Sequence, residues 1–458
     1  MRRRTALASS PRPRHENGRR AGRRLSVHAA TRTAIEATWR IESARIVGAL
    51  ARLLGGDLGL AEEFAQDALV AALEHWPRRG VPDNPGAWLM ATARNRALDR
   101  QRRHRLASGK LAELEADMEA TGAVVVPDAT DDLDARAGVV DDVLRLVFTA
   151  CHPVLGEDAR VALTLKVVVG LTTHEIARAF LVSEPTIAQR LVRARRTLRE
   201  AAVPFELPSA DALGERLASV LEVLYLIFNE GYSATAGSEW MRPDLAAEAL
   251  RLGRMLASHA PAEAEVHGLA ALMELQAARM PARADAEGRP ILLADQDRSR
   301  WDRLLIRRGL VALTRAERLA ARPGFYQLQA AIAACHVRAP STRATDWPEI
   351  ARLYGVLGDL APSPVIQLNR AVAISMAEGP VAALELIDTI QDQRALGRYP
   401  WLPAVRGDLL ARLGRHDEAR REFLRAADLA GNEREAELMR TRASASAAAA
   451  LASAADGH

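Results

Sequence analysis

The sequence predicts an all-α protein built from several domains. From about residue 34 to residue 443, apolar residues recur at helical spacing, and the alternation typical of strands is rare. Even the run "KVVVG" at 166–170 is better explained as the end of a buried helix. The chain has 458 residues, too many for one ordinary domain, so about two to four domains are expected.

The domain boundaries follow from shifts in composition. Both ends and one internal stretch lack clear periodicity, and helical blocks lie between them. We expect a disordered basic arm at 1–33, a first helical block at 34–106, a linker at 107–138, a second block at 139–205, a helical extension at 206–443 and a disordered tail at 444–458.

Composition narrows the class of protein. Cys151 and Cys335 are the only cysteines, which excludes a disulfide framework and a cysteine-rich metal site and fits a reducing cytoplasm. No run approaches the roughly 18 apolar residues that a membrane helix needs. The arginines near the N-terminus are not followed by the apolar core of a signal peptide. We therefore expect a cytoplasmic protein without a membrane segment.

The first helical block pairs an acidic helix with a basic one. Residues 55–76 place four polar side chains at helical spacing: Glu62, Glu63, Gln66 and Asp67. Residues 84–103 then combine an apolar set (Trp88, Leu89, Ala93 and Leu98) with a polar and basic set (Arg94, Asn95, Arg96, Arg100, Arg102 and Arg103). Taken alone, the acidic set is better explained as a solvated helix face. We expect Trp88 to anchor the core of this block.

The second block contains two short helices separated by a four-residue break. Thr172 and Glu175 have the spacing of a capping box, and Ser183 can cap the second helix, whose first turn tolerates Pro185. The predicted outer surface of the second helix is polar and basic, and it comprises Thr186, Gln189, Arg190, Arg193 and Arg196. Two short helices with a tight turn predict a helix-turn-helix, whose second helix enters the DNA major groove. A solvated arginine-rich helix is the simpler alternative.

In this order, the two blocks resemble the extracytoplasmic-function (ECF) class of bacterial RNA polymerase sigma factors. The family's acidic–Gln–acidic pattern, which docks on the core polymerase, corresponds to Glu63, Gln66 and Asp67. The family's −10 promoter run corresponds to Trp88, Arg94, Asn95, Arg96, Asp99, Arg100, Arg102 and Arg103. Its −35 reader corresponds to the helix with Thr186, Gln189, Arg190, Arg193 and Arg196. The resemblance covers roughly 170 residues and implies a region 2 domain, a linker and a region 4 domain.

The head of the second helix departs from the family pattern. Family members commonly have Gly-Thr-Val-Lys-Ser-Arg there, whereas this chain has Pro-Thr-Ile-Ala-Gln-Arg at 185–190. Loss of the lysine and the serine affects the −35 sequence that would be read. It does not remove the cations expected to contact DNA phosphates.

The remaining 250 or so residues are predicted to form a helical extension, tetratricopeptide-like toward its C-terminal half. Aligning Ile350, Ala383 and Ala419 gives spacings of 33 and 36, near the roughly 34-residue tetratricopeptide period. In the last copy, Gly407, Leu410, Gly414, Ala419, Phe423 and Ala426 occupy the small and large positions of that motif. The extension, including "LYLIFNEGYSAT" and "LLADQDRSRWDR", resembles the C-terminal region of one ECF subgroup.

The extension contains polar residues but no pattern typical of an active site. The candidates are Glu230, His259, His267, Asp295, Asp297 and Asp302. No metal-ligand spacing, phosphate loop or nucleophile motif accompanies them, so helix capping and internal ion pairs explain them better. We expect no cofactor, no metal and no catalytic residue.

Two functions from different classes fit these patterns. The first is a sigma factor that binds core RNA polymerase and promoter DNA and is modulated by its extension, which would bind a protein or peptide partner. The second is a stand-alone helix-turn-helix regulator, with the first block for dimerisation and the extension as a sensor. The acidic set at 63–67 and the run at 88–103 favour the first, because a stand-alone regulator has no use for them. An enzyme fused to a sigma module is a weaker third possibility.

Overall fold

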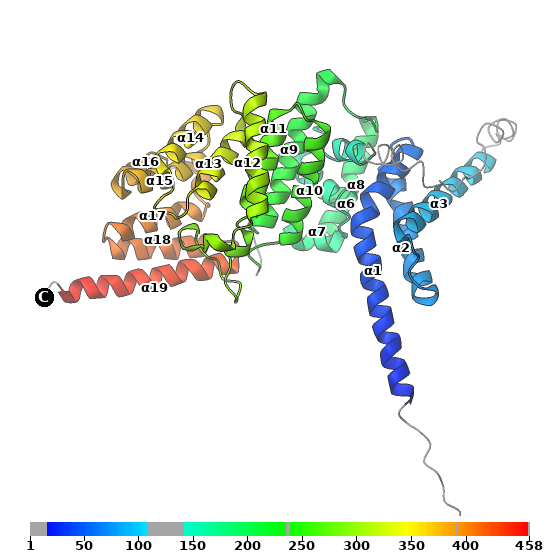
Figure 1. Ribbon diagram of the computed structural model, residues 1–458, viewed down its shortest axis with the longest axis horizontal. Coiled ribbons are helices and arrows are strands. Elements are labelled where there is room, and N and C mark those ends of the chain that lie inside the picture. Colours follow the sequence, from blue (N-terminus) through cyan, green and yellow to red (C-terminus); the bar gives the residue numbers. More distant parts are fainter. Residues whose placement is uncertain (1–15, 108–141, 181, 235–238, 391–392, 457–458) are drawn as a thin grey trace, which may run out of the picture. The chain divides into compact units, whose positions relative to one another are not determined.

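A computed structural model describes residues 16–107, 142–180, 182–234, 239–390 and 393–456. Helices dominate these ranges, which contain no strand beyond one isolated bridge between Ala284 and Pro290. This confirms the all-α prediction (Figure 1). Two compact units are distinguished by their internal contacts. One combines Met1–Ile176 with Ile187–Arg216, and the other combines Ala177–Thr186 with Leu217–His458.

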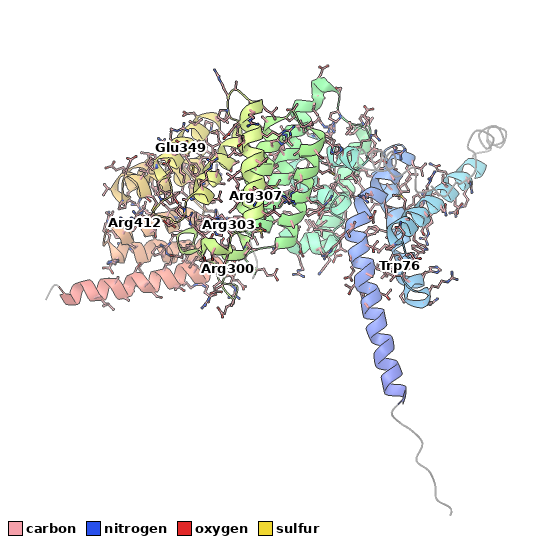
Figure 2. The ribbon with its side chains drawn as sticks, viewed as in Figure 1. Trp76, Arg300, Arg303, Arg307, Glu349 and Arg412 are labelled. Atoms are coloured by element: carbon pink, nitrogen blue, oxygen red, sulfur yellow. The ribbon has the colours of Figure 1, made fainter. Side chains whose placement is uncertain are left out.

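Three helices open the first unit: α1 (Glu16–Leu53), α2 (Leu58–Arg79) and α3 (Pro85–Ala107). The carboxylate of Asp57 caps α2 by accepting from the amides of Gly59 and Leu60, at 3.0 and 3.1 Å. Asn84 caps α3 by accepting from the amide of Ala87 at 3.1 Å. The core between the three helices includes Ile46, Leu50, Phe64, Trp76 and Leu89, all buried (Trp76 is labelled in Figure 2).

The rest of this unit is a second group of helices. It consists of a helix over residues 142–150, α6 (Glu157–Val167), α7 (Thr173–Phe180), whose last residues belong to the other unit, and most of α8 (Glu184–Glu200). Cys151 is buried directly after the first of these helices. Burial raises the pKa of its thiol to about 12, and Thr164 lies 3.3 Å from its Sγ.

The second unit begins with helices packed around one buried helix. They are α9 (Ala210–Tyr232), whose first residues belong to the first unit, α10 (Pro243–His259), α11 (Ala264–Ala277), α12 (Arg303–Leu319) and α13 (Phe325–Arg338). Three short 3₁₀ helices, η1 (Met280–Ala282), η2 (Leu293–Asp295) and η3 (Arg298–Arg300), lie between α11 and α12. Almost every side chain of α11 is buried, because α10, α12 and α13 all pack against it.

The C-terminal half of the extension is a row of helices, each packed on the next. It comprises α14 (Trp347–Leu360), α15 (Pro364–Ala377), α16 (Pro380–Ile390), η4 (Arg394–Leu396), α17 (Trp401–Arg412), α18 (His416–Leu429) and α19 (Glu433–Asp456). The aligned residues Ile350, Ala383 and Ala419 fall on the alternate helices α14, α16 and α18, and all three are buried. The predicted period is therefore the spacing of helix pairs.

Small and large residues interlock in these pairs as the repeat motif requires. A Cβ added at Gly407 of α17 would lie 2.9 Å from Cε1 of Phe423 on α18, so only glycine permits this approach.

Arg412 of α17 (Figure 2) also contacts α15. It donates to the hydroxyl and the carbonyl of Ser375, at 3.1 and 2.9 Å.

Two boundaries differ from the expectation. Residues 16–33, expected to belong to a disordered arm, are helical as the first part of α1, and residues 444–456 of the expected tail are helical as part of α19. Alanine has the highest helix propensity, and a formed helix extends at little further cost, so both stretches continue their helices. In α19 the side chain of Ser446 is buried, which adds packing to propensity. Residues 1–15 of the arm and 108–138 of the linker lie outside the described residues.

No helix in the described ranges is both long enough and apolar enough to span a membrane.

Candidate nucleic-acid interface

The helix-turn-helix forms with the caps that its sequence predicts. The Thr172 hydroxyl accepts from the Glu175 amide at 3.1 Å, and the Glu175 carboxylate accepts from the Thr172 amide at 2.8 Å. This is a complete capping box for α7. At α8, the Ser183 hydroxyl accepts from the Thr186 amide at 3.3 Å, and Pro185 lies in the first turn. Local sequence therefore determines where each of the two helices begins.

The apolar stripe of α8 is buried and its opposite face is open. Ile187, Leu191, Ala194 and Leu198 form the buried stripe. Of the predicted DNA contacts, Thr186, Gln189, Arg193 and Arg196 are exposed, and Arg190 is half-buried.

These predicted −35 residues differ in how far they are already engaged. Across the described residues, neither Gln189 nor Arg193 makes a side-chain hydrogen bond or ion pair, so both can contact DNA without breaking anything. Arg190 instead pairs with Asp158 of α6 at 2.8 Å, and Arg196 pairs with Glu200 at 2.8 Å. The hydroxyl of Thr186 is hydrogen-bonded to the hydroxyl of Ser183, at 2.7 Å.

Helix α3 carries the predicted −10 residues on its solvent side. Leu89, Ala93 and Ala97 are fully buried at four-residue intervals and form its back. The exposed residues are Arg94, Asn95, Asp99, Arg100, Arg102 and Arg103, and Arg96 is half-buried. Trp88 is half-buried with its ring 5.5 Å from that of Trp76, edge to face, which fits a core anchor at the rim of this surface.

The predicted polymerase-binding residues face these arginines across two helices. Asp67 of α2 pairs with Arg96 at 3.4 Å, and Glu63 pairs with Arg100 at 3.5 Å. All four side chains are 40–55% exposed, so each pair contributes little to stability and can exchange partners on binding. Gln66 is exposed and donates from its amide to Glu62 at 2.8 Å.

A buried ionic cluster that we did not predict lies next to this set. Glu62 is only 7% exposed, accepts from Arg195 of α8, and has the Lys166 amine of α6 at 3.4 Å. Glu62 shares its helix face with Leu58, Ala65 and Leu69. A carboxylate in this apolar stripe is the sequence feature that could have predicted a buried ion pair. The sequence does not indicate its cationic partners, because they lie more than 100 residues away.

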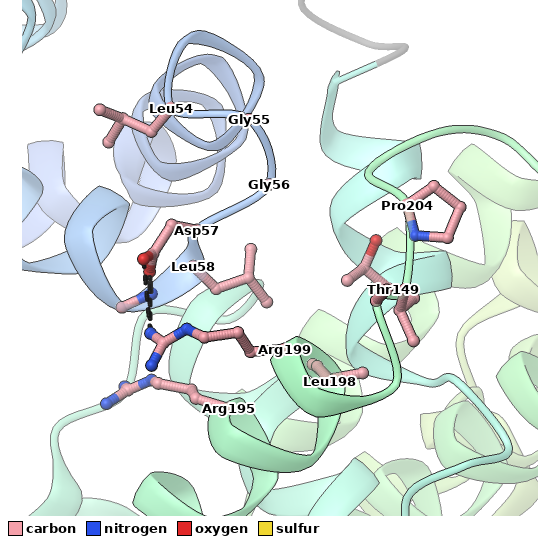
Figure 3. Close-up of a pocket in the computed structure, with 13 residues that line it drawn as sticks. Leu54, Gly55, Gly56, Asp57, Leu58, Thr149, Arg195, Leu198, Arg199 and Pro204 are labelled. Carbon is pink, nitrogen blue, oxygen red and sulfur yellow. Dashed lines mark hydrogen bonds and ion pairs between the residues drawn. The ribbon is translucent and has the colours of Figure 1, made fainter.

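Further contacts join the same two groups of helices. The Trp39 indole of α1 donates to the Gly170 carbonyl at 3.3 Å. Gly170 has φ +78°, and a Cβ there would lie 2.4 Å from the Ser43 hydroxyl, so glycine is required twice over. Near the start of α2, a cavity of about 470 Å³ lies between residues 54–59 and the end of α8, with Arg199 against Asp57 at 3.4 Å (Figure 3).

Two of the polar candidates in the extension, Asp297 and Asp302, cap helices. Asp302 caps α12 by accepting from the amides of Leu304 and Leu305, and Asp297 accepts from Ser299. Arg298 donates to the carbonyls of His336 and Ala339 and stacks 4.7 Å over the Trp301 ring. Within the described residues, no three His, Cys, Asp or Glu side chains are grouped as a metal site.

Comparison with known proteins matches these segments separately. Residues 41–106 match the model of Sigma-70 region 2, residues 145–198 match that of Sigma-70, region 4, and residues 216–317 match a family of unknown function, DUF6596. An uncharacterized protein of Rhizobium meliloti (strain 1021) is 46% identical over 395 residues, which is 86% of this chain and 91% of that protein. No solved structure matches the chain.

Proposed function

The chain belongs to the sigma-70 family of transcription initiation factors and carries a C-terminal extension, and from this premise we propose that it is an ECF-type sigma factor whose extension modulates its activity. The observation that carries the ECF assignment is the short interval between the two matched segments. Only residues 107–144 separate them, which is too short for a further domain of ordinary size.

The proposed contacts divide by chemistry. Glu63, Gln66 and Asp67 of α2 bind core RNA polymerase. The −10 element is contacted by the exposed side of α3, with Arg94 and Asn95 available at once and Arg96 and Arg100 released from their weak pairs. Gln189 and Arg193 on α8 are the first residues to contact the −35 element. Glutamine is suited to base edges and arginine to guanine and phosphate.

A stand-alone regulator fits less well. A stand-alone regulator would use residues 34–106 for dimerisation. Residues 41–106 instead match Sigma-70 region 2. The extension serves better as a binding platform, because stacked helix pairs generate surfaces suited to peptides or protein segments. We propose that it binds a protein or peptide partner in the cytoplasm, where the polymerase acts.

Reconstituted transcription tests this function. Core polymerase plus the purified chain should start transcripts at a defined site on genomic fragments, while the chain alone binds the same duplex weakly. Tight and specific duplex binding without polymerase, together with no association with the core enzyme, would reject it. A variant of Gln189 then identifies the −35 element on the selected promoter, because base preference should change there.

A further inference from the structure

The corner of the helix-turn-helix groups with the extension. Residues Ala177–Thr186 group with Leu217–His458, although they lie between two segments of the first unit. Helix α7 ends at Phe180, and the last carbonyls of any helix lack partners within the helix. Two of them are bonded by Arg242: one guanidinium nitrogen donates to the Ala179 carbonyl, and the other lies 3.5 Å from the Arg178 carbonyl.

Arg242 is held in place for this contact. Its guanidinium also donates to Glu230 near the end of α9, a carboxylate only 5% exposed. Its own backbone amide donates to the Gly231 carbonyl at 2.8 Å, directly before α10 begins. The Arg242 side chain is 17% exposed. A solvated arginine has none of these restraints, and a cation at a helix C-terminus is favoured by the helix dipole.

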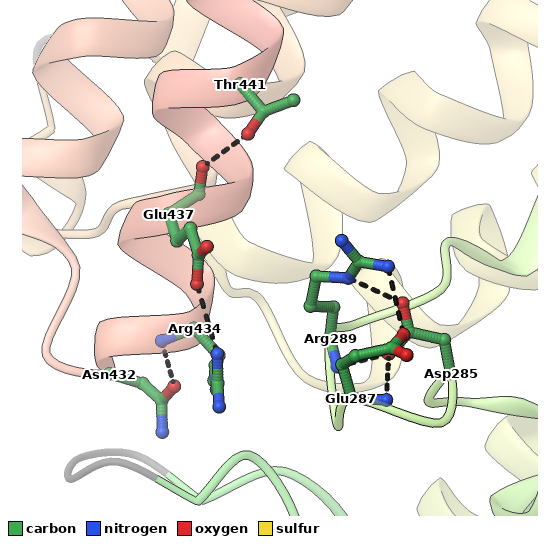
Figure 4. A network of polar contacts seen from close by, with 7 residues as sticks. All are labelled: Asp285, Glu287, Arg289, Asn432, Arg434, Glu437 and Thr441. Atoms are coloured by element: carbon green, nitrogen blue, oxygen red, sulfur yellow. Dashed lines mark hydrogen bonds and ion pairs between the residues drawn. The ribbon is translucent and has the colours of Figure 1, made fainter.

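The loop that carries Arg242 is anchored from the far end of the chain. Asn432, at the start of α19 (Figure 4), donates from its amide to the Glu239 carbonyl at 2.9 Å. Arg283 is buried between two rings of the same segment, 3.4 Å from the Tyr232 centroid and 4.4 Å from that of Trp240. The extension thus supports Arg242 from α9 and α19 at once.

We propose that Arg242 is a positioning residue, through which the extension sets the corner of the helix-turn-helix for reading the −35 element. This inference rests on the proposed sigma function and deepens it. The C-terminal cap of α7 fixes where α8 begins, and a groove-reading helix tolerates little misalignment. A partner that changes the extension would therefore change −35 reading and leave core-polymerase binding alone.

The test compares Arg242→Gln with Arg251→Gln in the full chain. Arg251 is exposed on α10 and pairs only with Glu248 of its own helix in the described structure, so it matches the charge change without the contact. Two templates are used: the selected promoter, and the same promoter with its −35 element replaced. Arg242→Gln should lower transcription at least tenfold on the first template and less than twofold on the second, with core affinity unchanged. Arg251→Gln should match the wild type on both.

Equal losses on both templates, or full activity of Arg242→Gln, would overturn the proposal. Should Arg242→Gln unfold, Arg242→Lys serves instead: it keeps the charge but cannot span Glu230 and two carbonyls, so a smaller, still −35-dependent loss is expected. If the wild type does not transcribe with core polymerase, the sigma function is wrong. Hydrogen exchange then tests separately whether Arg242 holds the end of α7. Amide protection over residues 177–190 should fall in Arg242→Gln and not in Arg251→Gln, and unchanged protection would contradict it.

Discussion

At the scale of single residues, Gln189 offers the sharpest test of DNA reading. Its side chain is exposed on α8 and, among described residues, unengaged, so its loss should leave the fold intact. Gln189→Ala should cost about 1–3 kcal/mol at one base position and little elsewhere, because it removes a base-edge contact. Transcription competition across single-base variants of the −35 element measures this.

Arg193→Ala is the matched control for Gln189→Ala. Arg193 is also exposed and unengaged within the described structure, and we propose that it contacts phosphate, which carries no sequence information. Its loss should weaken all sequences alike and lower the salt slope by about 1. If both variants weakened binding uniformly, the assignment of Gln189 as a base reader would be wrong.

His336 predicts a pH dependence of stability in the extension. Burial, with Arg279 and Arg298 nearby, lowers the pKa of His336 to about 3, whereas an unfolded histidine titrates near 6.5. Below about pH 6.5 the unfolded chain therefore binds a proton that the folded chain does not. The free energy of unfolding should fall by up to ~2 kcal/mol between pH 6.5 and 5, before most carboxylates titrate.

Urea unfolding at pH 7, 6 and 5 checks this slope against His336→Gln, which cannot titrate. The variant should lose clearly less stability over the same interval, and we expect the remaining loss to come from His152 and His267, whose pKa values burial also lowers. Parallel curves for the two proteins would show that His336 is protonated equally in both states.

Residue-level prediction succeeded where the partners are local. The caps at Thr172, Glu175 and Ser183 depend on three-residue spacings, which a sequence displays directly. Arg190 was assigned to DNA without its partner Asp158, because nothing in the helical pattern of α6 shows which way that carboxylate faces. Arg242 and its carbonyl acceptors, 63 and 64 residues away, were likewise beyond reach.

At the scale of elements, the surface of α2 should bind polymerase without supporting the fold. Asp67→Lys should lower core-polymerase affinity about tenfold, ~1.4 kcal/mol, because it reverses a charge in the proposed contact. The melting temperature should change little, since the pair between Asp67 and Arg96 is half-exposed. Glu74→Lys, on an exposed position of the same helix, makes the same charge change and should retain core affinity. Equal losses in the two variants would indicate a general charge effect.

Helix boundaries were predictable where a cap or a proline marks them. Thr172 and Ser183 were predicted as caps, and they cap α7 and α8 in the structure. The start of α1 and the end of α19 were placed wrongly, because arginine- and alanine-rich stretches without apolar periodicity resemble disordered tails. Intrinsic helix propensity, together with burial of Ser446 in α19, accounts for the observed ends of these helices.

At the scale of the whole molecule, truncation after residue 205 should change promoter output. The shortened chain keeps residues 177–186 but loses every contact that they make with the extension, including the Arg242 cap. We expect −35-dependent transcription to fall while core affinity stays within about twofold. In vitro transcription with purified core polymerase compares the truncated chain with Arg242→Gln in the full chain. The comparison measures how much of the lost transcription is due to the Arg242 contacts. Equal promoter activity with and without residues 206–458 would contradict the regulatory role.

The buried cluster of Glu62, Lys166 and Arg195 bears on the timing of initiation. DNA elements named −10 and −35 lie about 25 base pairs apart, roughly 85 Å at ~3.4 Å per base pair. In the proposed function the exposed sides of α3 and α8 bind these two elements at once, and we therefore expect the contacts through Glu62 to open first. Charges regain hydration on opening, so an ionic closure is more reversible than an apolar one. Opening is unimolecular, and the rate of holoenzyme formation should therefore reach a plateau as core polymerase is raised, with Glu62 setting its height.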